Sequence, residues 1–275
     1  DNTIQIPDGF KFEDKGPAKS EKFHEFEKTH AKIINKSVYI KESPENVIIM
    51  SEKNLITSYK HISTSEGESF IKKWIDKNDN IRCYDDMDIY PNSALCPKNM
   101  FNLWRPFKME SFHGEHTPMD EELKIMLKHI KVLCGNDEDV YSYFVKWIAQ
   151  MIQYPEVKSI MPTLISKQGA GKGTLLLLMS KMLGAEKVFE TTDPSRDVWG
   201  SFNGIMKSAF LVNLNELEKK SAVESEGRIK GLITDSTLTI NQKGIDQYKI
   251  KSYHRFIATT NKEDPVKTST DDRRM

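Results

Sequence analysis

A glycine-rich segment in the second half of the sequence has the residue types and spacing that bind phosphate groups. It reads Gly169-Ala170-Gly171-Lys172-Gly173-Thr174 and follows the apolar stretch Ser159 to Ser166. Glycines let the backbone curl so that its N–H groups point at phosphate oxygens, and a helix that follows adds its positive N-terminal end. Lys172 would supply a charge for the β and γ phosphates of a nucleotide. Residues 169–174 are therefore predicted to bind nucleotide, against the alternative of a glycine-rich turn that binds nothing.

Two positions depart from the usual form of such a loop. Ser166 stands where a first glycine is common, and Gly173 stands where a serine or threonine usually follows the lysine. Thr174 comes one place later, and its hydroxyl is the predicted magnesium ligand, directly or through a water molecule. The loop is thus expected to hold Mg²⁺ with a shifted ligand.

A second polar pair follows another apolar stretch. Phe210 to Leu214 predicts a buried strand, and Asn215-Glu216 come at its end. Hydrolysis of a nucleoside triphosphate needs a group there that orients Mg²⁺ or polarises the attacking water. We expect Glu216 to be the general base, and Asn215 to contact the magnesium shell without adding charge. The alternative is a strand end capped by solvated polar residues.

A third apolar stretch, from Arg255 to Thr259, leads to Asn261. Parallel strands deliver the residues after them to the same edge of a sheet, so Asn261 is expected to reach the γ phosphate or the attacking water as a sensor. Near the end of the sequence, Arg273 or Arg274 could reach a nucleotide held by a neighbouring subunit. A turn-forming asparagine and two surface arginines are the alternatives.

A predicted β-hairpin carries most of the local positive charge. Thr237 to Ile240 and Gln247 to Ile250 pair across a turn near Lys243-Gly244. Residues 227–261 hold six cationic and two acidic residues, whereas the whole chain is balanced at 40 of each. Predicted contacts to a DNA phosphate backbone are Lys243, Lys249 and Lys251. The alternative is a solvated hairpin whose lysines keep its edge soluble.

The elements around these motifs predict an α/β fold with a central parallel sheet. The phosphate-binding core would occupy residues 156–275 and be truncated at its C-terminal end. A helical region at 111–155 would precede it, with helices from 119 to 133 and from 137 to 152, the second capped by Asp137.

Residues 1–110 are predicted to form a mixed or linker region of uncertain fold. Within it, residues 20–34 have the charge pattern of a helix. Residues 83–118 are rich in proline, asparagine and aromatic residues, which favours an irregular connector.

Bulk composition excludes two classes of protein. Hydrophobic residues make up 38% and charged residues 29% of the chain, which is too apolar for a disordered protein. The longest apolar run, Leu175 to Met179, is too short to span a bilayer. The three cysteines form no CxxC pair, which favours free thiols in a reducing compartment.

The order of the motifs, more than any one of them, resembles a family. The glycine loop, Asn215-Glu216, the basic hairpin, Asn261 and the paired arginines together resemble a superfamily 3 helicase. Specifically, they look like the poxvirus-type primase-helicase group of large DNA viruses and phages. The resemblance covers residues 100 to 275.

The resemblance implies a P-loop, AAA+-like ATPase core that uses ATP and Mg²⁺ to move on single-stranded or forked DNA. It carries over Lys172 as the phosphate lysine, Glu216 as the catalytic carboxylate and Asn261 as the sensor. It further implies a homo-hexameric ring in the full-length protein, an arginine finger at Arg273 or Arg274, a possible primase domain upstream, and a place in the host cytoplasm or viral replication site.

Two other functions fit parts of the pattern. Nucleoside monophosphate kinases have a similar glycine loop, but they place it near the N-terminus and follow it with arginine-rich clamps. A P-loop protein that binds DNA without unwinding it, such as a packaging ATPase, would share the loop and the basic hairpin.

Overall fold

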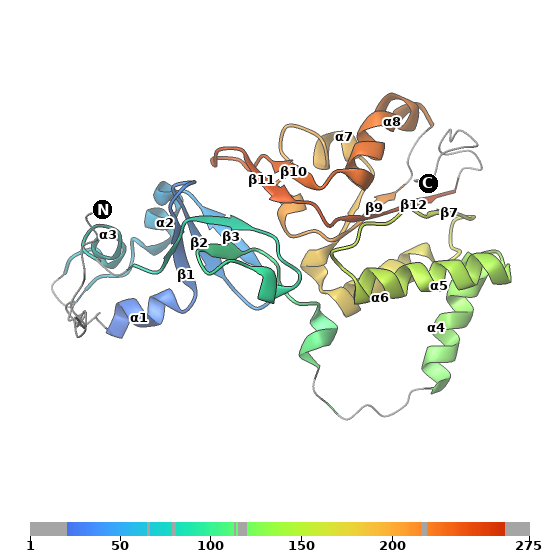
Figure 1. Cartoon of the computed structure of the whole chain (residues 1–275), viewed down its shortest axis with the longest axis horizontal. Helices are drawn as coiled ribbons and strands as arrows, with labels where there is room; N and C mark the ends of the chain where they lie inside the picture. Colours follow the sequence, from blue (N-terminus) through green and yellow to red (C-terminus); the bar gives the residue numbers. More distant parts are fainter. Residues whose placement is uncertain are drawn as a thin grey trace, which may run out of the picture.

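The computed structural model describes residues 21–64, 67–78, 81–112, 114, 120–215 and 219–261, with the backbone alone at 219–226. These residues form two lobes, and Figure 1 shows the N-terminal lobe beside a larger one that is built on a parallel sheet. The larger lobe contains the glycine loop.

The sheet of the larger lobe has the strand order β7-β12-β9-β8. Its strands are β7 (Thr163–Ile165), β8 (Val188–Thr191), β9 (Leu211–Asn215) and β12 (Arg255–Thr260). All three neighbouring pairs are parallel. The last strand in the chain, β12, lies between β7 and β9, so its polar end is placed between the glycine loop and the end of β9. The expected α/β fold with a parallel sheet is confirmed.

Three helices lie on one side of this sheet, and the first of them packs against the second (Figure 1). They are α4 (Asp120–Leu133), α5 (Glu138–Gln153) and α6 (Lys172–Leu183). Leu211 and Ile257 on the sheet pack against their apolar residues. As predicted, Asp137 caps α5, because its side chain accepts bonds from two backbone N–H groups of the first turn. The predicted helices at 119–133 and 137–152 are confirmed to within a residue, and so is the helix expected after the glycine loop.

The other face carries a helix, a hairpin and shorter elements (Figure 1). These are α7 (Pro194–Asp197), α8 (Lys219–Thr234), β10 (Thr237–Ile240), β11 (Tyr248–Lys251) and the 3-10 turn Gly204–Lys207, whereas the 3-10 turn Ala185–Lys187 contacts α6. Strands β10 and β11 pair antiparallel, and Gly244 adopts φ +79° in the turn between them. The predicted hairpin is therefore confirmed.

The N-terminal lobe is a second four-stranded sheet, of order β3-β2-β1-β4, with three short helices. The elements are α1 (Glu21–Glu27), β1 (His30–Ile33), β2 (Val38–Glu42), β3 (Val47–Met50), α2 (Glu52–Tyr59), α3 (Phe70–Asp76) and β4 (Cys83–Tyr84). The helix expected at 20–34 is wrong beyond Glu27. Residues 30–33 pair instead with β2 and β4, so contacts distant in sequence override the local helical pattern.

The connector expected to be irregular also contains strands. Strands β5 (Asp86–Asp88) and β6 (Met100–Asn102) pair in parallel, and 3-10 turns form at Ser93–Leu95 and Lys108–Ser111. Each strand has only three residues. Such short segments are defined by their pairing partner and give no periodic signal of their own, which explains the missed prediction.

One continuous apolar core joins the two lobes. It includes Ile33 and Ile49 from the N-terminal sheet, Phe101 from the connector, and Val212 and Phe256 from the parallel sheet. The region of residues 21–112 is thus packed onto the larger lobe.

Candidate nucleotide-binding site

The loop between β7 and α6 has the backbone shape that its glycines permit. It leaves the sheet beside β12, where the Ser166 N–H donates to the carbonyl oxygen of Thr260 at 3.1 Å. Gly169 and Gly171 adopt φ +81° and +94°, which side-chain-bearing residues rarely adopt. Gly171 is the N-cap of α6, so Lys172 is the first helical residue. The loop thus brings the positive end of α6 to the edge of the sheet.

The ammonium of Lys172 is folded back onto the start of the loop. Its Nζ donates to the carbonyl oxygen of Ser166 at 2.7 Å and to the Ser166 hydroxyl at 3.0 Å. The residue that departs from the usual first glycine therefore gives the lysine a second acceptor. A phosphate oxygen would have to replace these bonds.

Helix α4 contacts the loop through His129. Its Nε2 lies 3.0 Å from the carbonyl oxygen of Gly171. A Cβ atom placed on Gly171 would lie 2.2 Å from His129 Cε1, so a side chain there would displace the His129 ring in addition to straining the backbone at this φ angle. Sequence reasoning did not single out His129, since a lone histidine on an amphipathic helix carries no motif.

A cavity of about 420 Å³ opens over the loop and the ends of three strands. This is within the usual range for small-molecule sites. It is lined by Gln168, Gly169, Ala170, Gly171, Lys172, Gly173, Thr174, Leu176, Glu190, Asn215, Thr259, Thr260 and Asn261. The fold therefore brings together the predicted loop residues 169–174, Asn215 and Asn261, although they are far apart in the sequence.

A chain of polar side chains crosses the sheet beneath this cavity. Asn213 is fully buried, and its Nδ2 donates to Glu190 Oε2 at 2.7 Å and to Thr259 Oγ1 at 2.9 Å. Thr259 Oγ1 in turn lies 3.0 Å from Asn215 Oδ1. Glu190 and Asn213 are register partners, as are Asn215 and Thr259, so the four side chains share the sheet face that α6 covers.

The hydrogen positions in this network decide whether Asn215 presents its amide oxygen or its N–H groups to a ligand. The Thr259 hydroxyl accepts a bond from Asn213, and its single proton lies within reach of two amide oxygens, Asn215 Oδ1 at 3.0 Å and Asn213 Oδ1 at 3.1 Å. Donating that proton to Asn215 Oδ1 leaves the amide N–H groups of Asn215 for a ligand. Those groups suit a phosphate oxygen better than a metal ion.

Sequence reasoning missed Glu190, which is exposed and lines the cavity. It lies on β8, a strand of four residues that was not predicted. The run Val188-Phe189-Glu190-Thr191 is rich in aromatic and β-branched residues, and that was the available signal.

Three predicted site residues lie outside the described residues. They are Glu216, which directly follows Asn215, and the pair Arg273 and Arg274.

The predicted DNA-binding lysines lie on the hairpin, away from the nucleotide cavity's lining. Lys243 and Lys249 are exposed. Lys251 is half-buried: its Nζ lies 3.7 Å from the centre of the Tyr90 ring, and its backbone N–H donates to Asp88 at 2.7 Å. Lys251 therefore packs on the connector, whereas the other two reach solvent.

The positive charge counted over residues 227–261 is not all at the surface. Arg255 is fully buried in β12 and donates to the carbonyl oxygens of Tyr154 and Val157. Burial lowers its pKa to about 10. Arg255 therefore holds the turn after α5 and adds nothing to a basic surface.

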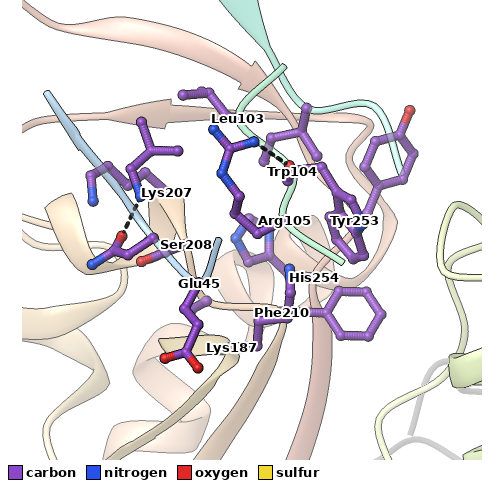
Figure 2. Close-up of a pocket in the computed structure, with 14 residues that line it drawn as sticks. Glu45, Leu103, Trp104, Arg105, Lys187, Lys207, Ser208, Phe210, Tyr253 and His254 are labelled. Atoms are coloured by element: carbon purple, nitrogen blue, oxygen red, sulfur yellow. Dashed lines mark hydrogen bonds between the residues drawn. The ribbon is translucent and has the colours of Figure 1, made fainter. Parts of the chain in front are cut away.

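A second cavity lies where the two lobes meet (Figure 2). Its volume is about 20 Å³, room for roughly one water molecule. Lys187 is almost fully buried there, with its Nζ 3.6 Å from the centre of the Trp104 ring. Burial lowers the pKa of Lys187 to about 7, and the nearby Glu110 opposes that shift. The cavity is too small for a nucleotide, so its residues serve the lobe junction.

His254 lines the same cavity and is buried. Its ring is bonded on both sides, to the Met206 carbonyl oxygen at 2.8 Å and to Ser252 Oγ at 3.0 Å. Burial lowers the pKa of His254 to about 4, so the ring stays neutral and structural.

Among the helices of the described residues, none is both long and apolar enough to cross a membrane.

Comparison with known proteins relates the chain to a phage replication protein. A family of unknown function (DUF5906) matches residues 164–274. A DNA primase-polymerase of Nitratiruptor phage NrS-1 is 32% identical over 177 residues, which are 63% of this chain and 24% of that protein. The chain thus spans about a quarter of the length of that relative.

Solved structures share the fold. An apo structure of the NrS-1 C-terminal region has a TM-score of 0.72 at 24% identity, and the match covers 91% of this chain and 59% of that one. A second apo structure of that region gives a TM-score of 0.69 at 24% identity, over 91% and 58%.

Proposed function

We propose that this chain is an ATP-hydrolysing DNA helicase motor of the superfamily 3 type, acting in phage-type DNA replication. One observation carries the proposal: the glycine loop, Asn215 and Asn261 line a single cavity. The similarity to part of a phage DNA primase-polymerase supports a role in replication.

In this proposal the loop binds the phosphates of ATP. The N–H groups of residues 169–174 and the N-terminal end of α6 face the phosphates, and Lys172 exchanges its bonds to Ser166 for bonds to phosphate oxygens. Asn215 donates an N–H to a phosphate oxygen or to the attacking water. Asn261, at the end of β12, contacts the γ phosphate as the sensor.

Glu216 takes a proton from the attacking water as the general base. In the sequence it directly follows Asn215, the last residue of β9. Arg273 or Arg274 acts on the nucleotide of a neighbouring subunit in a homo-hexameric ring.

Magnesium fits the residues that line the cavity. Thr174 and Glu190 offer oxygen atoms of the kind that Mg²⁺ prefers, and Asn215 can hydrogen-bond a magnesium-bound water. When bound with ATP, the ion neutralises phosphate charge during hydrolysis. Glu216 completes the set proposed for the metal.

The hairpin is the proposed contact to DNA. Lys243 at the turn and Lys249 on β11 reach solvent and can neutralise phosphates of a single strand without reading bases. An upstream primase domain in the full-length protein is part of the same proposal, because the relative is a primase-polymerase.

An ATPase measurement with and without single-stranded DNA tests the function. The proposal expects turnover that DNA stimulates and that Lys172→Ala abolishes, followed by unwinding of a forked duplex by the full-length protein. Phosphoryl transfer to AMP would instead identify a nucleoside monophosphate kinase. DNA-stimulated ATPase without unwinding by the full-length protein would identify a non-unwinding DNA-binding ATPase.

A further inference from the structure

Glu190 is the one carboxylate among the described residues that line the nucleotide cavity. The other polar side chains of the strand ends there are amides and hydroxyls, from Asn215, Thr259, Thr260 and Asn261. Asn215 occupies a position where an acid is common, and its amide adds no negative charge; its Oδ1 lies 3.0 Å from Thr259 Oγ1. Among the strand-end side chains that line the cavity in the described part of the chain, only Glu190 therefore carries negative charge.

The orientation of Glu190 is fixed by the sheet. Its Oε2 accepts from Asn213 Nδ2 at 2.7 Å, and Asn213 is itself fully buried and bonded to Thr259. A buried amide in the middle of a parallel strand is costly unless its bonds are made, and here two neighbouring strands make them. One carboxylate oxygen of Glu190 is thus held by Asn213, and the second is left to face the cavity.

From this geometry we propose that Glu190 supplies carboxylate charge to the magnesium shell of the bound nucleotide, and that Asn213 is the residue that positions it. The inference rests on the proposed function of the cavity. In this proposal Glu190 on β8 supplies the negative charge that Asn215 on β9 lacks. Glu190 acts on the metal or on its bound water, while Glu216 remains the proposed base.

The negative charge of Glu190 allows an experiment to distinguish binding to Mg²⁺ from direct binding to the nucleotide. A carboxylate repels the phosphates of metal-free ATP and attracts Mg²⁺. Glu190→Gln should therefore leave ATP binding in EDTA unchanged or slightly tighter. The same variant should raise the Mg²⁺ concentration needed for half-maximal tightening of nucleotide binding by about tenfold or more.

The experiment is a fluorescence titration of the whole chain with a labelled ATP analogue, first in EDTA and then with increasing Mg²⁺. Electron paramagnetic resonance with Mn²⁺ counts the bound ion directly. Glu186→Gln is the matched control, because Glu186 is also an exposed glutamate close to β8 but bonds Asn46 at the lobe junction. It should behave as the wild-type protein in both titrations.

Asn213→Ala tests the proposal that Asn213 positions Glu190. Like Glu190→Gln, it should raise the Mg²⁺ concentration needed for half-maximal tightening of nucleotide binding. The double variant should need little more Mg²⁺ than Glu190→Gln alone, because both changes act through one carboxylate. Should the buried variant fail to fold, the exposed Glu190→Gln still decides the inference.

The possible outcomes distinguish a failure of the Glu190 proposal from a failure of the proposed ATPase function. A wild-type protein that binds and hydrolyses ATP, with Glu190→Gln and Glu186→Gln sharing its Mg²⁺ dependence, overturns the role of Glu190 alone. A wild-type protein that binds no nucleotide in EDTA or Mg²⁺ overturns both proposals.

Discussion

His129 Nε2 lies 3.0 Å from the carbonyl oxygen of Gly171, so helix α4 rests on the loop that precedes α6. A side chain at Gly171 would have to displace the His129 ring and break this contact. The region before the parallel sheet is thus in direct contact with the proposed phosphate-binding loop.

Gly171→Ala is expected to destabilise the protein by about 1–3 kcal/mol and to abolish nucleotide binding. The new methyl group would meet His129 at 2.2 Å, and alanine would have to adopt φ +94°. Thermal unfolding and nucleotide titration measure the two effects.

Gly173→Ala is the matched control for stability. Gly173 lies within α6, and a Cβ there would meet nothing within 4 Å. Alanine should therefore raise stability by up to about 1 kcal/mol. Equal melting temperatures for the two variants would contradict the close approach of His129.

Glu216→Gln is expected to lower ATP turnover by about 10²–10⁴-fold while nucleotide binding is kept, because the amide cannot take a proton from water. Steady-state hydrolysis measures the loss of turnover, and nucleotide titration measures the retained binding. Glu218→Gln, at the next carboxylate in the chain, should hydrolyse ATP normally. Full turnover in Glu216→Gln would move the base to another residue.

The hairpin lysines are expected to divide into two kinds. Lys243→Ala and Lys249→Ala should weaken single-stranded DNA binding and each reduce the salt dependence of log K by about 0.7. Melting temperatures should stay unchanged, because both side chains are exposed.

Lys251→Ala is expected to act on stability instead. Removing its contact with the Tyr90 ring should cost about 1 kcal/mol, measured by chemical denaturation. The division fails if Lys251→Ala weakens DNA binding as much as Lys243→Ala while its stability is unchanged.

Lys187 is expected to make stability depend on pH. Its pKa is about 7 in the folded protein and 10.5 when exposed, because burial disfavours the charged amine. Between these values the unfolded chain binds the extra proton, so this group's contribution to stability rises with pH from about 7 to 10.5 and is lost as pH falls through 7.

Lys187→Met should remove that dependence. The variant is expected to be more stable relative to wild type at pH 6 than at pH 9, with a difference that changes by up to about 1.4 kcal/mol per pH unit within the window. Urea unfolding of both proteins at several pH values isolates Lys187 from other lysines. A difference that does not vary with pH would show that the Lys187 amine titrates normally.

The glycine loop and its helix were predictable because their signal is local. Two glycines need positive φ angles and a helix begins at Lys172, so residue types and spacing within a few positions define the element. The cavity that gathers Asn215 and Asn261 follows from parallel strands ending at one edge. Strand order decides which residues become neighbours, and no sequence pattern shows that β12 lies between β7 and β9.

Other features depend on contacts that sequence patterns do not contain. Strand β1 exists because it pairs with β2, although its residues continue a helical charge pattern. The packing of β8 brings Glu190 to the cavity, and the packing of α4 brings His129 to the glycine loop. Arg255 shows the same limit for charge: a count over residues 227–261 includes it, yet it is buried.

The core shared by both lobes sets how far the chain can be shortened. The family match begins at residue 164, but Val212 and Phe256 of the sheet share a core with Ile33, Ile49 and Phe101. On the opposite face, Leu211 and Ile257 share a core with residues of α4 and α5. A gene fragment that starts at the family boundary would therefore encode a sheet that has lost part of the apolar cover on each of its two faces. Recombinant production should begin ahead of β1, because a later start is expected to yield insoluble protein.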